Sequence, residues 1–431
     1  MRFGARLGQK FKSDGLQKPG LLHRLSELKK TKLIRRSAEF LPPAGDPMRE
    51  LLRDLRSREH DMLRLLGKFV RSESPSQDKA ALDLFGGIVA AEWRKRVART
   101  VILKQPKRGN HIRAEVWLGE GSPEGQIMVL GHLDTVYPLG TLARMPFRLS
   151  RGRGWGPGTF DMKGGLVLAL AAVDALRAHA IHKRWRPRKR FVFFWSSDEE
   201  IGSETSRKMI EDEARRSDVV LVLEPALGPQ GRLKTARKGV GTAEIIITGR
   251  AAHAGLNPEQ GVNAIHEAAL QIEKLMRMNH PSRGVTVQAT VISGGTTSNV
   301  VPASARIEVD LRYTKLSDAL TVEKKLRALR PMLKGARVEV RGGLNRPPLE
   351  RTANIGQLFE QAQELSRRIG ISLGEASVGG GSDGNFTAAV GVPTLDGLGA
   401  IGDGAHSPHE HILIRALAPR AALLAGLLIT L

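Results

Sequence analysis

The chain has no cysteine and few aromatic residues, and both shortages restrict what it can do. Without cysteine among its 431 residues, it can form no disulfide, bind no metal through a thiolate and use no cysteine nucleophile. Only 4% of the residues are aromatic, so surfaces on which single-stranded nucleic acid could stack are scarce. The apolar C-terminal stretch is interrupted by Arg415, Pro419 and Arg420, which leaves too short a run to span a bilayer. We therefore expect no membrane insertion and a final helix packed on a sheet.

Acidic residues are outnumbered by basic ones, and the formal charge of +23 first suggests a nucleic-acid partner. The excess is uneven, because residues 1–38 hold eleven Lys and Arg against two acidic residues, a net of +9 (11 − 2). No nucleic-acid-binding motif accompanies this charge, so we do not expect nucleic acid to be the main partner. The N-terminus lacks the apolar core and cleavage site of a secretory signal, which favours a cytoplasmic location. We interpret residues 1–46 as a basic extension, disordered or peripheral.

Strand-like and helix-like segments alternate over 47–237, which predicts an α/β domain with helices on both faces of its sheet. The expected helices cover 47–71, 79–99, 166–178 and 205–216, and the expected strands 127–130, 191–195 and 219–223. From 238 to 345 the order becomes β-α-β-β-α-β, that of a ferredoxin-like unit. Alternation resumes over 346–431, which would complete the first domain. The predicted fold is a doubly wound mixed-sheet catalytic domain with an inserted ferredoxin-like α+β domain.

Histidine and carboxylate side chains follow three of the expected strands. His132 and Asp134 close the first strand, Glu199 and Glu200 the second, and Glu224 the third. Ligands of open α/β sheets gather beyond the carboxyl ends of the strands, so these side chains should meet. A histidine with a carboxylate two residues on suits a metal ligand and its orienting partner, although a hydrogen-bonded turn is the ordinary alternative. Because adjacent residues point apart, one of the two glutamates could bind metal while the other moves protons.

Two further motifs supply donors from loops. Asp161 follows a Gly-Pro-Gly turn in GPGTFDMKGG, where it could bridge two cations or simply cap the next helix. His406, His409 and His411 crowd the segment GDGAHSPHEH, and we expect at most one of them to bind metal. Together the five motifs hold the histidines and carboxylates that a site for two divalent ions requires.

These motifs resemble those of the M20 family of metallopeptidases, most closely its glutamate carboxypeptidase branch. The resemblance runs from about residue 50 to the C-terminus and keeps both order and spacing. Its motifs are GHLDTVYP, GPGTFDMKGG, SSDEEIGS, LEPA, GRAAHAG, GGTTSNVVPASA, DLRY, GGGSDGNF and GAHSPHE. The basic extension is not part of the family pattern, and His409 and His411 stand where other residues are usual.

The resemblance implies a role for each site residue. His132 and Glu224 would bind one Zn²⁺, Glu200 and His406 a second, and Asp161 both, with a cis peptide bond after Asp161. Co²⁺ or Mn²⁺ are alternatives, because such donors serve several metals. Glu199 would be the general base and Asp134 the carboxylate behind His132. Asn299 and Arg312 would hold a substrate carboxylate, and His253 would reach a partner's site across a homodimer interface made by the inserted lid domain.

The implied activity is that of a two-zinc exopeptidase that cleaves a C-terminal amide bond beside a free carboxylate. A water held between the metals would lose a proton to Glu199, and a small peptide or N-acyl amino acid would be the substrate. An N-acyl-amino-acid deacylase or desuccinylase of the same family stays open, since only the pocket would differ. An inactive metal-binding or nucleic-acid-associated protein would lack a base or a ligand, and none is missing.

Overall fold

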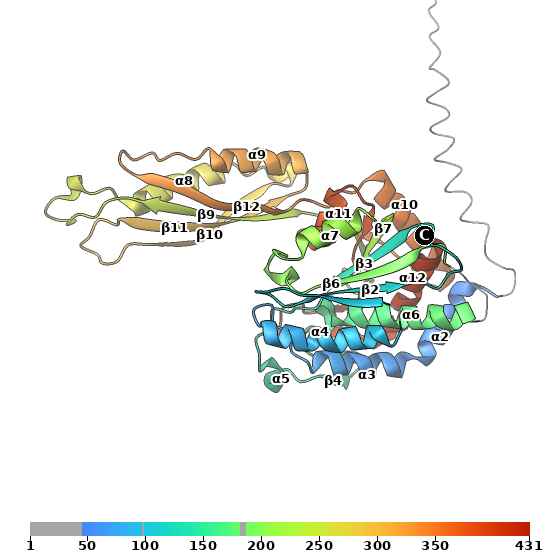
Figure 1. Ribbon diagram of the computed structural model, residues 1–431. Helices are drawn as coiled ribbons and strands as arrows, with labels where there is room; N and C mark the ends of the chain where they lie inside the picture. The colour runs from blue at the N-terminus through green and yellow to red at the C-terminus, as the bar shows by residue number, and fades with distance from the viewer. Residues whose placement is uncertain (1–44, 97–98, 182–186) are drawn as a thin grey trace, which may run out of the picture. The chain divides into compact units, whose positions relative to one another are not determined.

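A six-stranded mixed sheet forms the centre of the larger α/β part in the computed structural model, which describes residues 45–96, 99–181 and 187–431 (Figure 1). Its order is β1-β2-β6-β3-β7-β14. Strands β6, β3, β7 and β14 run parallel, β2 pairs antiparallel with β6, and β1 pairs antiparallel with β2. The strands are β1 (Arg99–Leu103), β2 (His111–Val116), β3 (Gln126–His132), β6 (Arg190–Ser196), β7 (Val219–Val222) and β14 (Thr394–Leu395). The extension predicted over 1–46 lies outside the described residues, except for Gly45 and Asp46.

Helices cover both faces of this sheet because both faces of its central strands are apolar. On β3, Ile127 and Val129 join the large core, whereas Met128 and Leu130 join a separate core on the opposite face. The large core includes α2 (Pro47–Ser57), α3 (Glu59–Val70), α4 (Lys79–Arg94), α6 (Gly164–Ile181), α10 (Ala353–Arg368) and α12 (Leu417–Thr430). The opposite face is covered by α7 (Arg207–Ala214) and α11 (Gly384–Ala389).

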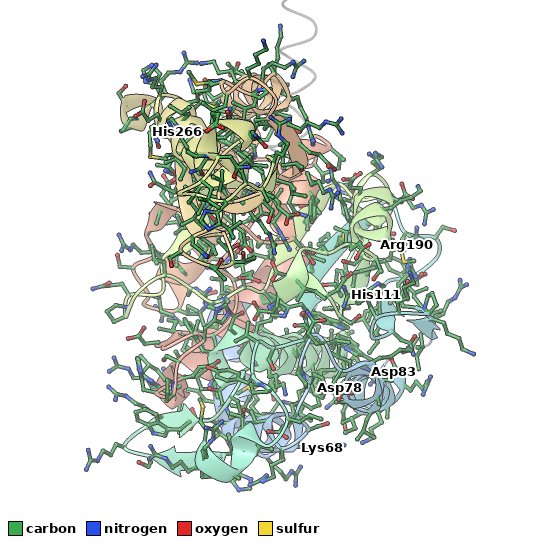
Figure 2. All side chains as sticks on the ribbon, turned by 90° about the vertical axis from the view of Figure 1, so that its left-hand side faces the viewer. Lys68, Asp78, Asp83, His111, Arg190 and His266 are labelled. Carbon is green, nitrogen blue, oxygen red and sulfur yellow. The ribbon has the colours of Figure 1, made fainter. Side chains whose placement is uncertain are left out.

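Short polar side chains set several helix starts. Asp78, labelled in Figure 2, precedes α4, and its carboxylate accepts a hydrogen bond from the Ala81 N–H at 2.9 Å. Asp46 does the same for α2 by accepting from the Met48 N–H at 3.0 Å. These bonds satisfy backbone donors that the first turn of a helix leaves free.

A second sheet, of four antiparallel strands in the order β10-β11-β9-β12, forms the ferredoxin-like unit (239–346). Its elements are β9 (Gly239–Thr248), α8 (Ala264–Met276), β10 (Thr286–Gly294), β11 (Ser304–Tyr313), α9 (Leu316–Arg327) and β12 (Arg337–Arg346). Both helices pack on one face, through residues such as Ala268 and Val322. The predicted fold class, a mixed α/β sheet domain with an inserted ferredoxin-like unit, is confirmed.

Two small sheets place further loops near the strand ends. One pairs β8 (Leu233–Arg237) with β13 (Glu375–Val378) in parallel. The other has the order β15-β16-β5-β4 and flanks the loop that holds His406. Its strands are β4 (Arg148–Ser150), β5 (Arg153–Trp155), β15 (Gly402–Asp403) and β16 (His411–Leu413).

The helix expected over 47–71 is wrong in one respect, because it is two helices. α2 ends at Ser57 and α3 begins at Glu59, with Arg58 (φ −96°, ψ 5°) outside both. The periodicity could not reveal this break, since Leu55 and Met62 lie seven residues apart and both remain buried. The helix expected over 79–99 also ends early, at Arg94.

The apolar C-terminal segment forms the predicted helix, α12, which contacts α2 and α6 and shares the large core with strands of the six-stranded sheet. In the described ranges, no helix combines the length and apolarity needed to cross a membrane. The cytoplasmic location expected from the sequence stays a prediction.

Candidate metal centre

Three adjacent strands of the six-stranded sheet deliver site residues to one edge. β3 ends at His132, β6 leads into a short turn that contains Glu199 and Glu200, and β7 is followed closely by Glu224. Because β6, β3 and β7 are parallel neighbours, their carboxyl ends lie side by side (Figure 1). The topology therefore brings together residues that are as many as 92 positions apart in the sequence (224 − 132).

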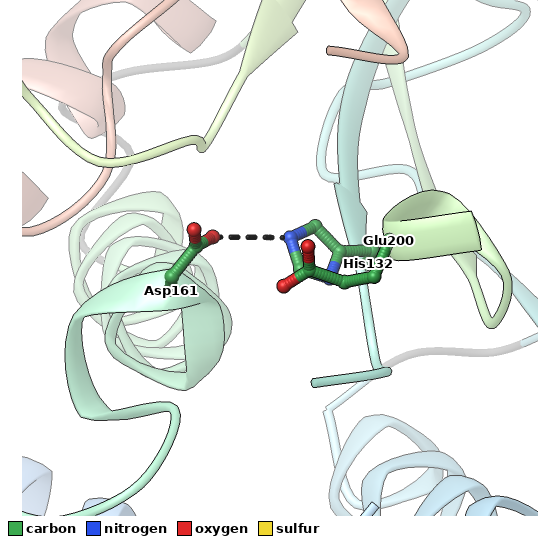
Figure 3. A group of neighbouring side chains, drawn as sticks. All are labelled: His132, Asp161 and Glu200. Carbon is green, nitrogen blue, oxygen red and sulfur yellow. Dashed lines mark hydrogen bonds and ion pairs between the residues drawn. The ribbon is translucent and has the colours of Figure 1, made fainter. Parts of the chain in front are cut away.

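Asp161 lies between two histidines, one facing each carboxylate oxygen. Its Oδ1 is 3.2 Å from Nε2 of His132, and its Oδ2 is 3.5 Å from Nε2 of His406. Glu200 Oε1 is 3.2 Å from Nε2 of His406, and Glu224 Oε1 is 3.5 Å from Nε2 of His132. Figure 3 shows the side chains of His132, Asp161 and Glu200 gathered at this point. One carboxylate thus connects two His–Glu pairs.

These separations suit ligands around a small cation. Ligand atoms placed tetrahedrally at about 2.0–2.1 Å from zinc lie about 3.3 Å from one another. The four nitrogen–oxygen separations here are 3.2, 3.5, 3.2 and 3.5 Å. In the described part of the chain, two groups could hold an ion, namely His132 with Asp161 and Glu200, and His132 with Glu199 and Glu224. The donors, imidazole nitrogen and carboxylate oxygen, are those that zinc, cobalt and manganese accept.

His132 is held from behind by the segment that follows it. Its Nδ1 lies 2.9 Å from the main-chain carbonyl of Asp134 and 3.4 Å from the carboxylate Oδ1 of the same residue. The carboxylate also accepts hydrogen bonds from the N–H groups of Glu199 and Glu200 (3.2 and 3.1 Å) and from the Ser76 hydroxyl (2.8 Å). Asp134 therefore connects the histidine to the glutamate pair, and the nearest acceptor for the imidazole is its carbonyl rather than its carboxylate.

The loop that carries Asp161 is fixed by a buried glutamate. The carboxylate of Glu410 accepts three main-chain hydrogen bonds, from Gly158, Phe160 and Asp161, at 2.8–2.9 Å. The Asp161–Met162 peptide bond is cis, as the family resemblance implied. The capping alternative is not adopted, because α6 begins at Gly164 while the Asp161 carboxylate faces the two histidines.

Glu199 does not stand free beside the cluster. Its Oε1 accepts a hydrogen bond from Nη2 of Arg346 at 3.0 Å, and the same nitrogen donates to Asp383 at 3.1 Å. Burial raises the pKa of Glu199 well above its usual value, and the Arg346 charge opposes that rise. Arg346 is the last residue of β12, so the ferredoxin-like unit reaches the predicted general base directly.

Glu224 is anchored on the side away from His132. Its Oε2 accepts a hydrogen bond from Nη2 of Arg237 at 3.1 Å, and Arg237 also pairs with both oxygens of Asp396. The side chains of Arg237 and Asp396 are 4% and 0% exposed. A buried ion pair therefore lies directly behind one predicted metal ligand.

The cluster is arranged to hold positive charge. Burial lowers the pKa of His132, but hydrogen bonds to Asp134, Asp161 and Glu224 outweigh it and raise that pKa well above its usual value. Hydrogen bonds to Asp161 and Glu200 raise the pKa of His406 to about 10. Burial also acts on Asp161, but its bonds to the two histidines hold its pKa below the usual range. A divalent cation would take the place of the protons on these imidazoles.

The three residues predicted to bind substrate lie in the ferredoxin-like unit. His253 and Asn299 are exposed neighbours there, because the Ala254 N–H donates to the Asn299 carbonyl at 2.9 Å. Arg312, on β11, donates through Nε and Nη2 to the Asp310 carboxylate at 2.9 and 2.8 Å. Within the described residues, none of the three bonds to a member of the metal-ligand cluster. Their roles stay predictions.

The other two histidines of the C-terminal motif face away from the ligands. His411 is buried, with its ring 4.5 Å from that of Trp155. His409 is exposed, and its Nδ1 lies 2.9 Å from the Ser407 hydroxyl. Of the three, only His406 lies beside Asp161.

Three residues that hold the cluster in place were not predicted from the sequence: Arg237, Arg346 and Glu410. Glu410 belongs to the motif GAHSPHE, but no pattern in the sequence distinguished this glutamate as a residue that supports the site. Arg237 ends the short strand β8 in KTARKG, and Arg346 precedes a Pro-Pro pair, where arginine is ordinarily a surface residue. Nothing local distinguishes these two from the other arginines.

The sequence matches one protein family, described as Peptidase family M20/M25/M40, over residues 128–430. Carboxypeptidase G2 from Pseudomonas sp. (strain RS-16) is 31% identical over 377 residues, which covers 86% of this chain and 89% of that protein. Succinyl-diaminopimelate desuccinylase 2 from Shewanella loihica is 28% identical over 309 residues, which covers 67% of this chain and 80% of that protein.

A solved structure has the same fold. The Bacillus subtilis YXEP protein, described as a dinuclear metal binding peptidase from the M20 family, superposes with a TM-score of 0.63 at 16% identity. The match covers 87% of this chain and 98% of that one. At this identity the likeness shows the fold alone, and it agrees with the predicted fold class.

Proposed function

We infer the function from one premise: this chain belongs to peptidase family M20/M25/M40 and is a hydrolase. We propose that it is a two-metal exopeptidase that cleaves the amide bond beside a free C-terminal carboxylate. The observation that carries this proposal is the position of Asp161 between His132 and His406, with Glu199 on the adjacent strand end.

Two Zn²⁺ ions would bind at the strand ends. His132 and Glu224 would hold one, Glu200 and His406 the other, and Asp161 would serve both. When bound, such ions polarise the scissile carbonyl and stabilise the negative charge that develops on it. Co²⁺ or Mn²⁺ would suit the same donors.

Glu199 would move the proton. Its side chain is only 12% exposed, and burial raises its pKa, although Arg346 opposes the shift. A carboxyl group with a raised pKa accepts and returns protons efficiently near neutral pH. Glu199 would therefore take a proton from the attacking water and return it to the leaving amine, while Asp134 keeps His132 oriented.

The free carboxylate of the substrate would bind to the ferredoxin-like unit. Arg312 already presents two donors to the Asp310 carboxylate, which is the geometry in which arginine recognises carboxylates. A hollow of about 740 Å³ lies beside it on the open face of the sheet. No member of the metal-ligand cluster lines this hollow, so the proposal includes closure of the unit over the cluster. Asn299 would supply a further donor.

The chain would act as a homodimer through the ferredoxin-like unit. β10 is an edge strand of that sheet, and Val291 and Ile292 on it are 50% and 54% exposed. An exposed apolar edge strand is a template for pairing with a second chain. Such a dimer would allow His253 to reach the metal centre of the other subunit.

A desuccinylase or N-acyl-amino-acid deacylase is the second candidate. The desuccinylase relative, at 28% identity, favours it, because a succinyl group also places a free carboxylate near the amide bond. A desuccinylase differs from the exopeptidase in the side of the scissile bond that carries this carboxylate, which would be the acyl side. An N-acyl-amino-acid deacylase would keep the carboxylate on the amine side and differ in the acyl group.

A substrate panel tests the proposal. It should contain dipeptides and N-acyl amino acids ending in Glu, Asp or apolar residues, together with N-succinyl amines. We expect EDTA-sensitive hydrolysis that is restored by zinc and is fastest with a free C-terminal carboxylate. Preference for the succinyl amines would favour the second candidate. Salt-sensitive retention on DNA, without hydrolysis of any panel member, would contradict both.

A further inference from the structure

The buried guanidinium behind Glu224 uses every donor that it has. Nε of Arg237 donates to Asp396 Oδ2 at 2.7 Å, and Nη2 donates to Asp396 Oδ1 and Glu224 Oε2 at 3.0 and 3.1 Å. Nη1 donates to the carbonyls of Gly380 and Gly381 at 3.2 and 3.0 Å. An arginine has five N–H groups, and all five are bonded here. The guanidinium therefore cannot turn without breaking several buried hydrogen bonds.

Glu224 is oriented by this contact. One oxygen, Oε2, is bound to Arg237, while the other, Oε1, lies 3.5 Å from Nε2 of His132. The carboxylate therefore presents a single oxygen to the metal centre. Rotation to present both oxygens would remove the acceptor from a donor whose side chain is 4% exposed.

The charge of Arg237 does not cancel that of Glu224. Asp396, with a fully buried side chain, binds the guanidinium with both oxygens and is itself fixed by the Ser382 hydroxyl at 2.6 Å. The Arg237–Asp396 pair is neutral overall, so Glu224 keeps its negative charge for a cation. Glu224 is therefore a candidate carboxylate ligand that accepts a hydrogen bond from a fixed arginine. Removing such a hydrogen-bond partner of a metal ligand commonly changes metal affinity about 10- to 100-fold.

We propose that Arg237 is a positioning residue that sets Glu224 as a one-oxygen metal ligand, with Asp396 and the Gly380–Gly381 carbonyls holding the guanidinium in place. The inference rests on the metal centre of the proposed function and deepens it. Arg237 would thereby limit Glu224 to one oxygen on the ion that it would share with His132.

Zinc affinity tests this role without any substrate. Arg237→Met in the full chain should weaken one of the two zinc-binding steps about 10- to 100-fold, measured by competition with a chromophoric chelator. Arg113→Met is the matched control, since Arg113 is also largely buried and forms ion pairs with Glu213 on α7 and Glu115 on β2, away from the ligands. It should leave both zinc affinities unchanged.

Two further measurements separate positioning from a general effect on folding. In a Glu224→Gln background, Arg237→Met should cause no further loss of zinc affinity, because the residue acts through Glu224. In the cobalt-loaded protein, Arg237→Met should weaken the visible d–d absorption, as expected when a second carboxylate oxygen raises the coordination number. If Arg237→Met does not fold, Arg237→Lys replaces it, because an ammonium can pair with Asp396 but cannot reproduce the five-donor fork.

The proposal is overturned if a folded Arg237 variant binds both zinc ions as the native chain does. It is equally overturned if the loss of affinity persists undiminished in the Glu224→Gln background. Failure of the proposed function would look different. The native chain would bind two zinc ions and Arg237→Met would weaken zinc binding, but no amide substrate would be hydrolysed.

Discussion

The metal-ligand cluster and the ferredoxin-like unit place their polar side chains in opposite ways. In the cluster, the side chains of His132, Asp161 and Glu200 are 1%, 15% and 8% exposed, with His406 the exception at 50%, and each lies within 3.5 Å of another member. In the ferredoxin-like unit, His253 and Asn299 are exposed and Arg312 is 32% exposed. The difference indicates that the cluster proposed to be catalytic is already assembled, whereas the residues proposed to recognise substrate or to reach a second subunit are accessible.

Glu199→Ala should produce the largest effect and tests whether the cluster does the chemistry. We expect kcat to fall by about 10²–10⁴-fold, because proton transfer loses its carrier, while zinc content stays unchanged. Steady-state kinetics with metal analysis measures both. Glu204→Ala, which removes a side chain that is 77% exposed in the same segment, is the control and should be silent. Near-native turnover in Glu199→Ala would remove the role assigned to Glu199.

Arg346→Met removes the contact that joins the ferredoxin-like unit to Glu199. It leaves the carboxylates of Asp383 and Glu199, which are 3% and 12% exposed, without their cation. We expect the free energy of unfolding to fall by about 3 kcal/mol and kcat to fall with it. Arg341→Met on the same strand removes a 60% exposed side chain and should change stability little in urea unfolding. Equal behaviour of the two variants would mean that the contact is not a structural link.

Arg312→Ala tests only whether Arg312 binds the substrate carboxylate. Charge-assisted hydrogen bonds contribute about 1.5–3 kcal/mol, so KM for a substrate with a free carboxylate should rise about 10- to 100-fold. The amidated analogue should be unaffected, and zinc content should not change. Arg337→Ala, at an exposed position of β12 that does not line the hollow, is the control. Equal losses on both substrates would count against a carboxylate-binding role.

Glu92→Gln should have the smallest effect, confined to stability. Glu92 lies on α4, where burial raises its pKa but Lys68, Lys95 and Arg96 outweigh it and lower the pKa to about 2, from the usual 4.5. A lowered pKa means that the ionised group stabilises the fold above about pH 5 and that this contribution is lost as pH falls toward 2. The variant should therefore lose about 1 kcal/mol at pH 7, with native zinc content, and match the native chain near pH 2. A stability difference that does not depend on pH would contradict this origin.

The sequence predicted the part of the cluster that depends on strand ends. Parallel strands share an edge, so His132, Glu200 and Glu224 could be brought together from apolar runs alone. The residues behind them could not be predicted in this way. Arg346 reaches Glu199 over 147 positions and Glu410 reaches Phe160 over 250, and no periodicity links such pairs.

In the fold, too, local features could be predicted from the sequence and features that depend on tertiary contacts could not. Short continuous apolar runs predicted the buried strands β3, β6 and β7, and the order of strand-like and helix-like segments predicted the ferredoxin-like unit, because those patterns are local. The break at Arg58 left that pattern intact, and the packing of α12 on α2 and α6 depends on which helices share a core. Both required tertiary contacts that single-sequence patterns do not contain.

Metal content at controlled free zinc tests the central claim most directly. Purified protein, equilibrated with buffered zinc and measured by elemental analysis, should retain two ions per chain, and Asp161→Asn should retain at most one. Native protein that holds fewer than two ions in excess zinc, or an Asp161→Asn variant that still holds two, would contradict a metal pair joined by Asp161.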